Sequence, residues 1–171
     1  MHRHAYRSAH KLPRLVVLGE TQPLSPGAYL TLRREAAGLG LMQAASSLAA
    51  CPWAIGRPGM LAVRQARRRL QSAEDNVQHL TLPRAEALAS VIPLDPRVYE
   101  QLVDLHLAGP GSGLPVPQVC QLCACSWFDP CHDAHGQVCA WASPDLCTSC
   151  ADKAPPPRDL RAELAGMGEA A

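Results

Sequence analysis

Residues 120–150 read CQLCACSWFDPCHDAHGQVCAWASPDLCTSC and hold seven of the eight cysteines of the chain. Two Cys-x2-Cys pairs frame the stretch, Cys120 with Cys123 and Cys147 with Cys150. Each pair offers two thiolates to one ion, so the two pairs together supply the four ligands of a tetrahedral Zn²⁺ site. About thirty residues with little apolar surface rarely fold unaided, whereas a bound metal contributes free energy of folding. We therefore predict a Cys-rich zinc-ribbon or zinc-knuckle module over residues 119–151.

The three cysteines between the pairs leave the number of ions open. With one of two nearby histidines they supply a second four-ligand site, drawn from Cys125, Cys131, Cys139, His132 and His135. Alternatively, Cys123 or Cys125 bridges two zinc ions, because the spacing Cys-x2-Cys-x-Cys brings three thiolates close together. Cysteine acting as a small buried apolar residue and a four-thiolate iron–sulfur cluster are the other interpretations. A zinc held by four thiolates has no position for a reactive water, so we expect a structural site.

The predicted module is acidic. Residues 118–151 contain no lysine or arginine, but they contain Asp129, Asp133 and Asp145. A four-thiolate Zn²⁺ site adds two further negative charges, so we expect this surface to repel phosphate. Trp127 and Phe128 either pack over the metal or, where exposed, offer an aromatic anchor to a protein partner.

The charge of the whole chain is strongly asymmetric. The net charge is only +1, but residues 1–69 carry +9 and residues 70–171 carry −8. A basic segment of this strength is typical of proteins that bind polyanions, of which nucleic acid is the commonest. The alternative is a solvated basic face without a partner.

Outside the module the sequence favours helices. Aromatic residues make up only 4% of the chain, and the apolar residues are largely alanine and leucine, which favours helices over a β-sandwich. Ser25-Pro26 and Asp95-Pro96 each place a capping side chain before a proline, the pattern of a helix start. We predict helices over residues 27–37, 41–50, 60–71 and 82–92, and a fifth from residue 96.

The predicted organisation is therefore mainly α, a five-helix bundle followed by the small Cys-rich module. Residues 1–24 form a basic tail, residues 25–107 the helical domain and residues 108–118 a Gly/Pro linker. The module occupies residues 119–151, and residues 152–171 form a tail with a short helix.

The helical half resembles a class of DNA-reading domains. The order Ser25-Pro-Gly-Ala-Tyr-Leu-Thr-Leu-Arg-Arg-Glu-Ala-Ala-Gly-Leu, followed by Leu41–Ala50, resembles the first two helices of Cro/repressor-type helix-turn-helix domains. The resemblance spans roughly residues 25–105. It departs at Ala50–Gly59, which is longer than the usual turn of three or four residues and holds two prolines. The whole order also resembles small, uncharacterised phage or prophage-associated proteins.

This resemblance implies a DNA-contacting face. Arginines neutralise phosphates or read guanine edges, and one glutamine stands among them, so we expect phosphate contacts to dominate. Pairing of the arginines with Glu74, Asp75 or the acidic half of the chain is the structural alternative. The candidate residues are Arg33, Arg34, Arg57, Arg64, Gln65, Arg67, Arg68 and Arg69.

The sequence thus favours a DNA-binding regulator or accessory factor, most plausibly of transcription. Its partners would be double-stranded DNA and, through the acidic module, a protein or a second copy of the chain. No motif of an enzyme is present, and no run of residues is long enough to span a membrane. Without a targeting signal we expect a cytoplasmic, nucleoid-associated protein of a bacterial or phage-infected cell. The alternative function is a protein–protein adaptor in a phage or bacterial assembly, without DNA contact.

Overall fold

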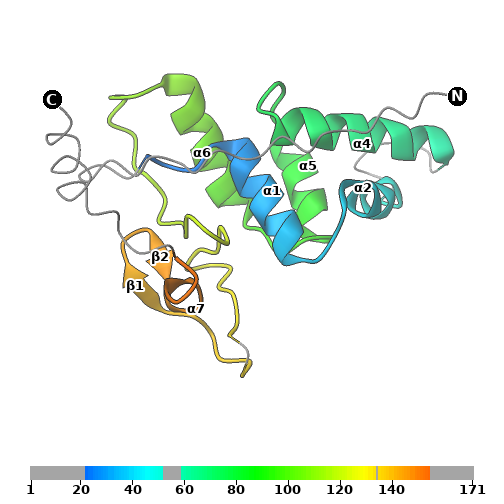
Figure 1. The fold of residues 1–171 in the computed structure, drawn as a ribbon. Coiled ribbons are helices and arrows are strands. Elements are labelled where there is room, and N and C mark those ends of the chain that lie inside the picture. Colours follow the sequence, from blue (N-terminus) through cyan, green and yellow to red (C-terminus); the bar gives the residue numbers. More distant parts are fainter. Residues whose placement is uncertain (1–21, 52–58, 134, 155–171) are drawn as a thin grey trace, which may run out of the picture.

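The computed structural model describes residues 22–51, 59–133 and 135–154, and these residues are mainly helical (Figure 1). The five longer helices are α1 (Pro26–Ala36), α2 (Leu41–Ala49), α4 (Met60–Glu74), α5 (Leu82–Ala89) and α6 (Pro96–Ala108). The Cys-rich part adds the antiparallel strands β1 (Trp141–Ser143) and β2 (Leu146–Cys147), then the short helix α7 (Thr148–Ala151). The mainly helical class is confirmed, and all five predicted helices occur. Helix α4 continues three residues beyond its predicted end, and α5 ends three residues before its own predicted end.

Two of the helices begin as the capping pattern predicts. The Ser25 hydroxyl accepts a hydrogen bond from the Ala28 amide at 3.2 Å, directly before α1. The Asp95 carboxylate accepts from the Arg97 amide at 2.7 Å and from the Val98 amide at 3.4 Å, directly before α6. In both helices proline takes the first position, where its missing N–H has no intrahelical partner to lose.

Alanine allows the helices of the core to approach closely. Helices α2 and α4 pack against each other through small side chains, and their buried alanines are Ala44, Ala45, Ala49, Ala62, Ala66 and Ala73. Larger apolar residues fill the space around α1, α5 and α6. The fully buried ones are Tyr29, Leu30, Leu70, Leu88, Ile92, Tyr99 and Leu102.

Asn76 ties the end of α4 to the start of α1. Its side-chain oxygen accepts from the Gly27 amide at 2.8 Å, and its side-chain nitrogen donates to the Ser25 hydroxyl at 3.2 Å. Asn76 adopts a left-handed φ of 56° just after α4 ends, a conformation that asparagine tolerates better than most residues. It therefore satisfies a donor of the first turn of α1 that has no partner within that helix.

Gly27 lies where α1 and α4 meet most closely. A Cβ atom at this position would lie 2.1 Å from the Glu74 carbonyl oxygen. We expect Gly27→Ala to lower the free energy of unfolding by at least about 1–3 kcal/mol, because one backbone must move away from the other. Urea denaturation followed by far-UV circular dichroism measures this loss. In the control Gly40→Ser the new Cβ faces the end of the flexible Gln43 side chain at 3.3 Å, and we expect little change. Equal stability of Gly27→Ala and wild type would contradict this packing.

The Cys-rich module packs directly against the helical part. Val119 and Ala124 are 5% and 0% exposed and belong to the same apolar core as the helices. The predicted linker, residues 108–118, has no regular secondary structure after α6 ends at Ala108. Figure 1 shows the module beside α1 and below α6. The predicted helix within residues 152–171 falls mostly outside the described residues, as does most of the tail predicted for residues 1–24.

No helix in the described ranges is both long and apolar enough to cross a bilayer.

Candidate metal centre

The first Cys-x2-Cys pair lies on a tight loop. The Ala124 amide donates to the Cys120 carbonyl at 2.8 Å, and the Cys120 amide donates to the Cys125 carbonyl at 3.0 Å. Ala124 adopts a left-handed φ of 59°, which reverses the chain directly after Cys123. Three cysteines therefore share one short loop, and two of them, Cys120 and Cys125, are fully buried.

A second turn brings Cys131 and Cys139 together. The Cys139 amide donates to the Cys131 carbonyl at 2.9 Å across an antiparallel pairing. The Asp133 carboxylate closes the intervening turn by accepting from the His135 amide at 2.8 Å and the Gln137 amide at 2.9 Å. These local hydrogen bonds hold two cysteines that are eight residues apart on facing segments.

The last two cysteines follow from the β1–β2 hairpin and α7. Cys147 lies opposite Trp141 in the antiparallel pairing. The Thr148 amide donates to the Ala140 carbonyl at 2.8 Å, and α7 begins there, which places Cys150 within the following turn. Cys147 and Cys150 are 0% and 5% exposed. The hairpin therefore returns the second Cys-x2-Cys pair to the first.

The sulfur atoms lie at separations typical of metal thiolates. The Sγ of Cys147 is 3.8 Å from that of Cys123 and 3.7 Å from that of Cys131. The sulfurs of Cys125 and Cys139 are 3.7 Å apart, and those of Cys123 and Cys131 are 3.9 Å apart. A disulfide would require about 2.05 Å, and every cysteine is a free thiol. A tetrahedron with Zn–S bonds of about 2.3 Å has sulfur–sulfur edges of about 3.8 Å.

Two groups of four sulfurs fit a metal ion. The first is Cys120, Cys123, Cys125 and Cys147, and the second is Cys125, Cys131, Cys139 and Cys147. Within each group all sulfur atoms lie within 4.8 Å of one another. The clustered cysteines can therefore bind a metal ion, as the spacing predicts. Two of them, Cys125 and Cys147, belong to both groups.

The structure changes the membership predicted for each site. Cys150, predicted in the first set, is buried in the same cysteine cluster but is outside both four-sulfur groups. His132 and His135, predicted as optional ligands, are exposed and join neither group. Histidine was a candidate only because it neighbours Cys131 in sequence, and the turn at Asp133 directs the chain there to solvent. The eighth cysteine, Cys51, lies beside Ser90 in the helical part.

The pKa values of four thiols in the cluster, those of Cys123, Cys125, Cys147 and Cys150, are raised. Hydrogen bonding to the Cys120 sulfur raises the pKa of Cys123 to about 12, and burial raises the pKa of Cys150 to about 12. The pKa of Cys120 is lowered, because the thiols of Cys123 and Cys125 donate hydrogen bonds to its sulfur. A metal ion must displace these protons, so metal affinity rises with pH.

The two aromatic residues predicted as a protein anchor are exposed. Trp127 is 66% exposed and Phe128 is 80% exposed. The Trp127 indole N–H donates to the Gln118 side chain at 2.9 Å, and its ring centroid lies 6.1 Å from that of Trp141. The alternative prediction, that both rings pack over the cysteines, does not hold for Phe128.

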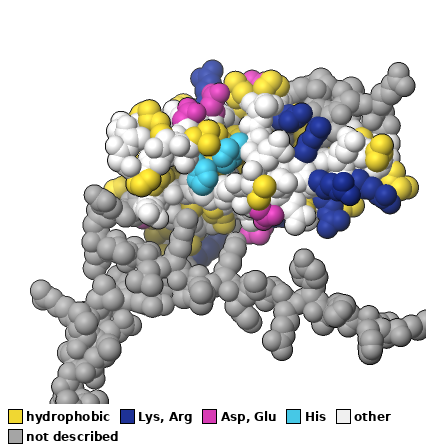
Figure 2. Space-filling model, turned by 90° about the horizontal axis from the view of Figure 1, so that it is seen from above, with side chains coloured by type: hydrophobic (Ala, Val, Ile, Leu, Met, Phe, Trp, Pro, Cys, Tyr) yellow, Lys and Arg dark blue, Asp and Glu magenta, His cyan; other side chains and the backbone are white. Residues whose placement is uncertain are grey.

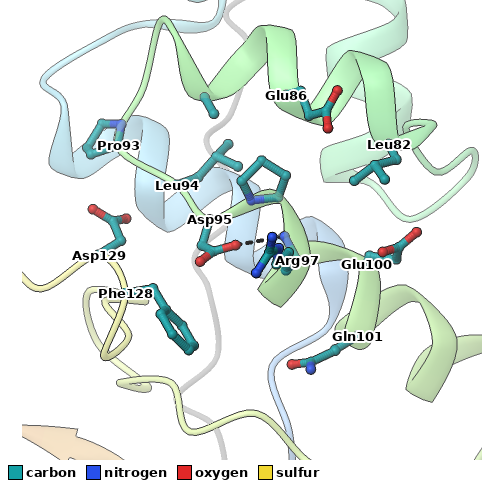
Figure 3. A pocket seen from close by; sticks show the side chains of 12 residues that line it. Leu82, Glu86, Pro93, Leu94, Asp95, Arg97, Glu100, Gln101, Phe128 and Asp129 are labelled. Atoms are coloured by element: carbon teal, nitrogen blue, oxygen red, sulfur yellow. Dashed lines mark hydrogen bonds between the residues drawn. The ribbon is translucent and has the colours of Figure 1, made fainter.

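Phe128 borders an acidic groove (Figure 3). The groove has a volume of about 800 Å³ and lies between α5, α6 and the loop that carries Phe128 and Asp129. Glu86 of α5 and Glu100 of α6 line its far side. The groove thus combines an exposed aromatic ring with carboxylates from two helices.

Arg33, predicted to contact DNA, instead connects α1 to the module. Its side chain is 2% exposed and forms an ion pair with Asp129. Its guanidinium also donates to the carbonyls of Pro93 and Cys123, the latter at 3.4 Å. Burial raises the pKa of Asp129, and the Arg33 charge opposes that rise. Arg33 is therefore not accessible to a nucleic acid, which corrects its place in the predicted set.

Arg34 is also engaged within the fold. Its guanidinium donates to both carboxylate oxygens of Glu74, at 2.6 and 2.8 Å, and to the Leu39 carbonyl at 2.9 Å. This is the alternative pairing with Glu74 considered from the sequence. Arg34 is one-tenth exposed and joins α1 to the end of α4.

The remaining predicted DNA contacts lie on α4. Arg64, Gln65, Arg67 and Arg68 are exposed, and Arg69 is half-buried. None of these arginines forms an ion pair with a carboxylate of the described residues. Figure 2 shows Lys and Arg side chains gathered at the end of the molecule toward which α4 extends. Arg57 lies outside the described residues.

The sequence pattern does not predict two of the interactions described above. Arg33 pairs with Asp129, which lies 96 positions later in the chain, and the Asn76 side chain accepts a hydrogen bond from the first turn of α1. One signal for Arg33 exists: it lies four residues after Tyr29 and three after Leu30, on the buried face of α1. The acidic groove could not be predicted from any single segment, because its residues come from α5, α6 and the loop that carries Phe128 and Asp129.

No family model matches the chain, and neither a curated protein nor a solved structure does.

Proposed function

We propose that the chain is a DNA-binding regulator or accessory factor of transcription that contacts duplex DNA through α4. The observation that carries this proposal is the set of exposed arginines on one helix, Arg64, Arg67 and Arg68, without carboxylate partners in the described part of the chain. Arginines left unpaired on a helix surface are suited to phosphate contacts. In this proposal the helical part resembles helix-turn-helix domains, and the chain catalyses no reaction.

We further propose that the metal is Zn²⁺ in a structural role. Sulfur–sulfur distances of 3.7 and 3.8 Å match the edge of its preferred tetrahedron, and four thiolates leave no position for water. An iron–sulfur cluster is the alternative, and visible absorption of the purified protein identifies it. The zinc-stabilised module would then serve as an acidic surface for a protein partner or a second copy of the chain. The cytoplasm, at the nucleoid, is the compartment that fits these activities.

The test is the salt dependence of DNA binding by charge-reversed variants. We expect Arg64→Glu/Arg67→Glu/Arg68→Glu to abolish retention of duplex DNA at moderate salt with helicity intact. For single substitutions, each lost phosphate contact lowers the slope of log affinity against log salt by about 0.9. Fluorescence anisotropy with a labelled duplex over a salt series measures both quantities.

A matched control separates contact from overall charge. Arg67→Glu on α4 and Arg97→Glu on α6 change an exposed arginine identically. We expect the slope to fall for Arg67→Glu and to stay constant for Arg97→Glu. Equal losses from both variants, or no binding of duplex DNA by the wild type at low salt, would remove α4 as the DNA-binding element.

The second candidate is an adaptor that binds protein and not DNA. The exposed Phe128 beside the carboxylates of Glu86 and Glu100 favours it. Such a groove suits a basic segment with an apolar anchor. Binding of a protein partner that is lost in Phe128→Ser, together with absent DNA binding, would establish this function instead.

A further inference from the structure

We infer that residues 119–151 hold two metal ions that share the thiolates of Cys125 and Cys147. This inference rests on the metal-binding part of the proposed function and is independent of the DNA-binding part. It assigns one ion to Cys120, Cys123, Cys125 and Cys147, and a second ion to Cys125, Cys131, Cys139 and Cys147.

The two sulfur groups fit two tetrahedra joined along one edge. Two separate four-coordinate ions need eight ligand positions, and the two groups together contain six cysteines. His132 and His135 are exposed and lie outside the sulfur groups, so histidine does not supply the remaining positions. Two thiolates that each bind both ions close the count, because a thiolate sulfur has lone pairs for two metal bonds.

Cys147 has the position that a shared ligand requires. Its sulfur lies 3.8 Å from Cys123, which belongs to the first group, and 3.7 Å from Cys131, which belongs to the second. Both distances match a tetrahedral edge of about 3.8 Å. Cys147 is 0% exposed at the end of β2, so its sulfur is shielded from water.

Cys125 is the second shared ligand. Its sulfur lies 3.7 Å from that of Cys139, a tetrahedral edge within the second site. It also lies within 4.8 Å of the sulfurs of Cys120, Cys123 and Cys147, the other members of the first group. Cys150 is 5% exposed in the same cluster but belongs to neither group, so it is assigned to neither ion.

Sharing two thiolates also reduces the buried negative charge. Six thiolates on two divalent ions leave two negative charges, whereas two separate four-thiolate sites would leave four. Residues 118–151 have no lysine or arginine to offset that charge. The Arg33 guanidinium, donating to the Cys123 carbonyl, brings a buried positive charge to the edge of the cluster.

The experiment loads the full chain with ¹¹³Cd²⁺ under reducing, oxygen-free conditions. Elemental analysis is expected to give two ions per chain, and ¹¹³Cd NMR two resonances with mutual scalar coupling, because each shared sulfur joins the ions through two bonds. Cys139→Ser should remove the second ion and the coupling. Cys51→Ser, outside the module, should retain both ions and the coupling.

Cys147→Ser tests a shared residue, and Cys150→Ser tests the assignment of the first site. We expect Cys147→Ser to hold fewer than two ions and to show no coupling. Cys150→Ser should retain both ions and the coupling; loss of an ion from this variant in its folded state would overturn the six-cysteine assignment. If a variant does not fold, the scalar coupling in the wild-type protein still shows whether the two ions share a thiolate.

One ion per chain, or two uncoupled resonances in the wild type, would overturn the shared site. One ion would leave the metal-stabilised module of the proposed function standing. A chain that binds no ion would remove both. DNA binding measured on the same loaded sample reports separately on α4.

Discussion

Chelation of the bound metal is expected to unfold residues 119–151 while the longer helices remain folded. The centre of the module consists of sulfur atoms, with Cys120, Cys125 and Cys147 fully buried. Its strands span only three and two residues, too few to stabilise a sheet without the metal. Metal binding contributes roughly 10–16 kcal/mol at structural zinc sites near neutral pH, so its loss exceeds what the remaining contacts supply.

Hydrogen exchange measured by mass spectrometry distinguishes the two parts of the chain. After chelation, the amides of Cys120, Ala124 and Cys139 should exchange at rates near those of an unfolded chain. Amides of the buried part of α4 should stay protected, because Leu70 and Ala66 pack in a core made by the other helices. Adding back one divalent ion at a time should restore protection.

A thiol-reactive probe supplies the control for this result. The seven module thiols should become reactive on chelation, while Cys51, half-buried beside Ser90, should react at the same rate before and after. Unchanged protection of the Cys139 amide after complete metal removal would show that the module folds by itself.

The sequence predicts those features that depend on neighbouring residues. The caps at Ser25 and Asp95 and the Cys-x2-Cys pairs act over three or four positions, so their spacing alone indicates a helix start or a ligand pair. The mainly helical class follows from the alanine and leucine content and from apolar periodicity. Clustering of Cys123, Cys131 and Cys147 also follows, because a metal needs ligands from several segments.

Features that depend on tertiary packing are not visible in the spacing. An arginine on α1 is expected to face solvent, and whether Arg33 does so depends on a carboxylate 96 residues later. The close approach of α1 to α4 depends on Gly27 and on the left-handed conformation of Asn76. The sequence around these two residues does not indicate that they lie where the two helices meet. Likewise, Cys125 and Cys147 belong to both four-sulfur groups because of where the β1–β2 hairpin places Cys147. The number and spacing of the cysteines do not determine which of them two ions would share.

Replacing Arg33 by methionine is expected to destabilise the metal-loaded protein by about 3 kcal/mol. Removing one partner of a buried ion pair typically costs about 3–5 kcal/mol, because the other charge remains without compensation. The Asp129 side chain is 20% exposed, so water relieves part of this cost and we expect the lower end of the range. The carbonyls of Pro93 and Cys123 also lose a donor. Urea denaturation of the loaded protein measures the change.

A double-mutant cycle with Asp129 separates the pair from the packing of the arginine stem. Arg33→Met/Asp129→Ala should be less destabilised than the sum of the two single variants, because the double change leaves no unpaired charge. Strict additivity of the two losses would show that the ion pair contributes nothing to stability.

Arg34→Met provides the matched comparison for the metal centre. Arg34 neighbours Arg33 on α1, and its partner Glu74 belongs to the helical part, with side chains 11% and 10% exposed. Both variants should lower the stability of the helices, since each breaks a largely buried pair. Only Arg33→Met should also weaken metal retention in competition with a chelator, because Arg33 alone of the two donates to the Cys123 carbonyl and binds Asp129 of the module. Equal metal retention in the two variants would mean that α1 supports the module through apolar packing of Val119 and Ala124, and that the buried guanidinium has no part in holding the cysteines in place.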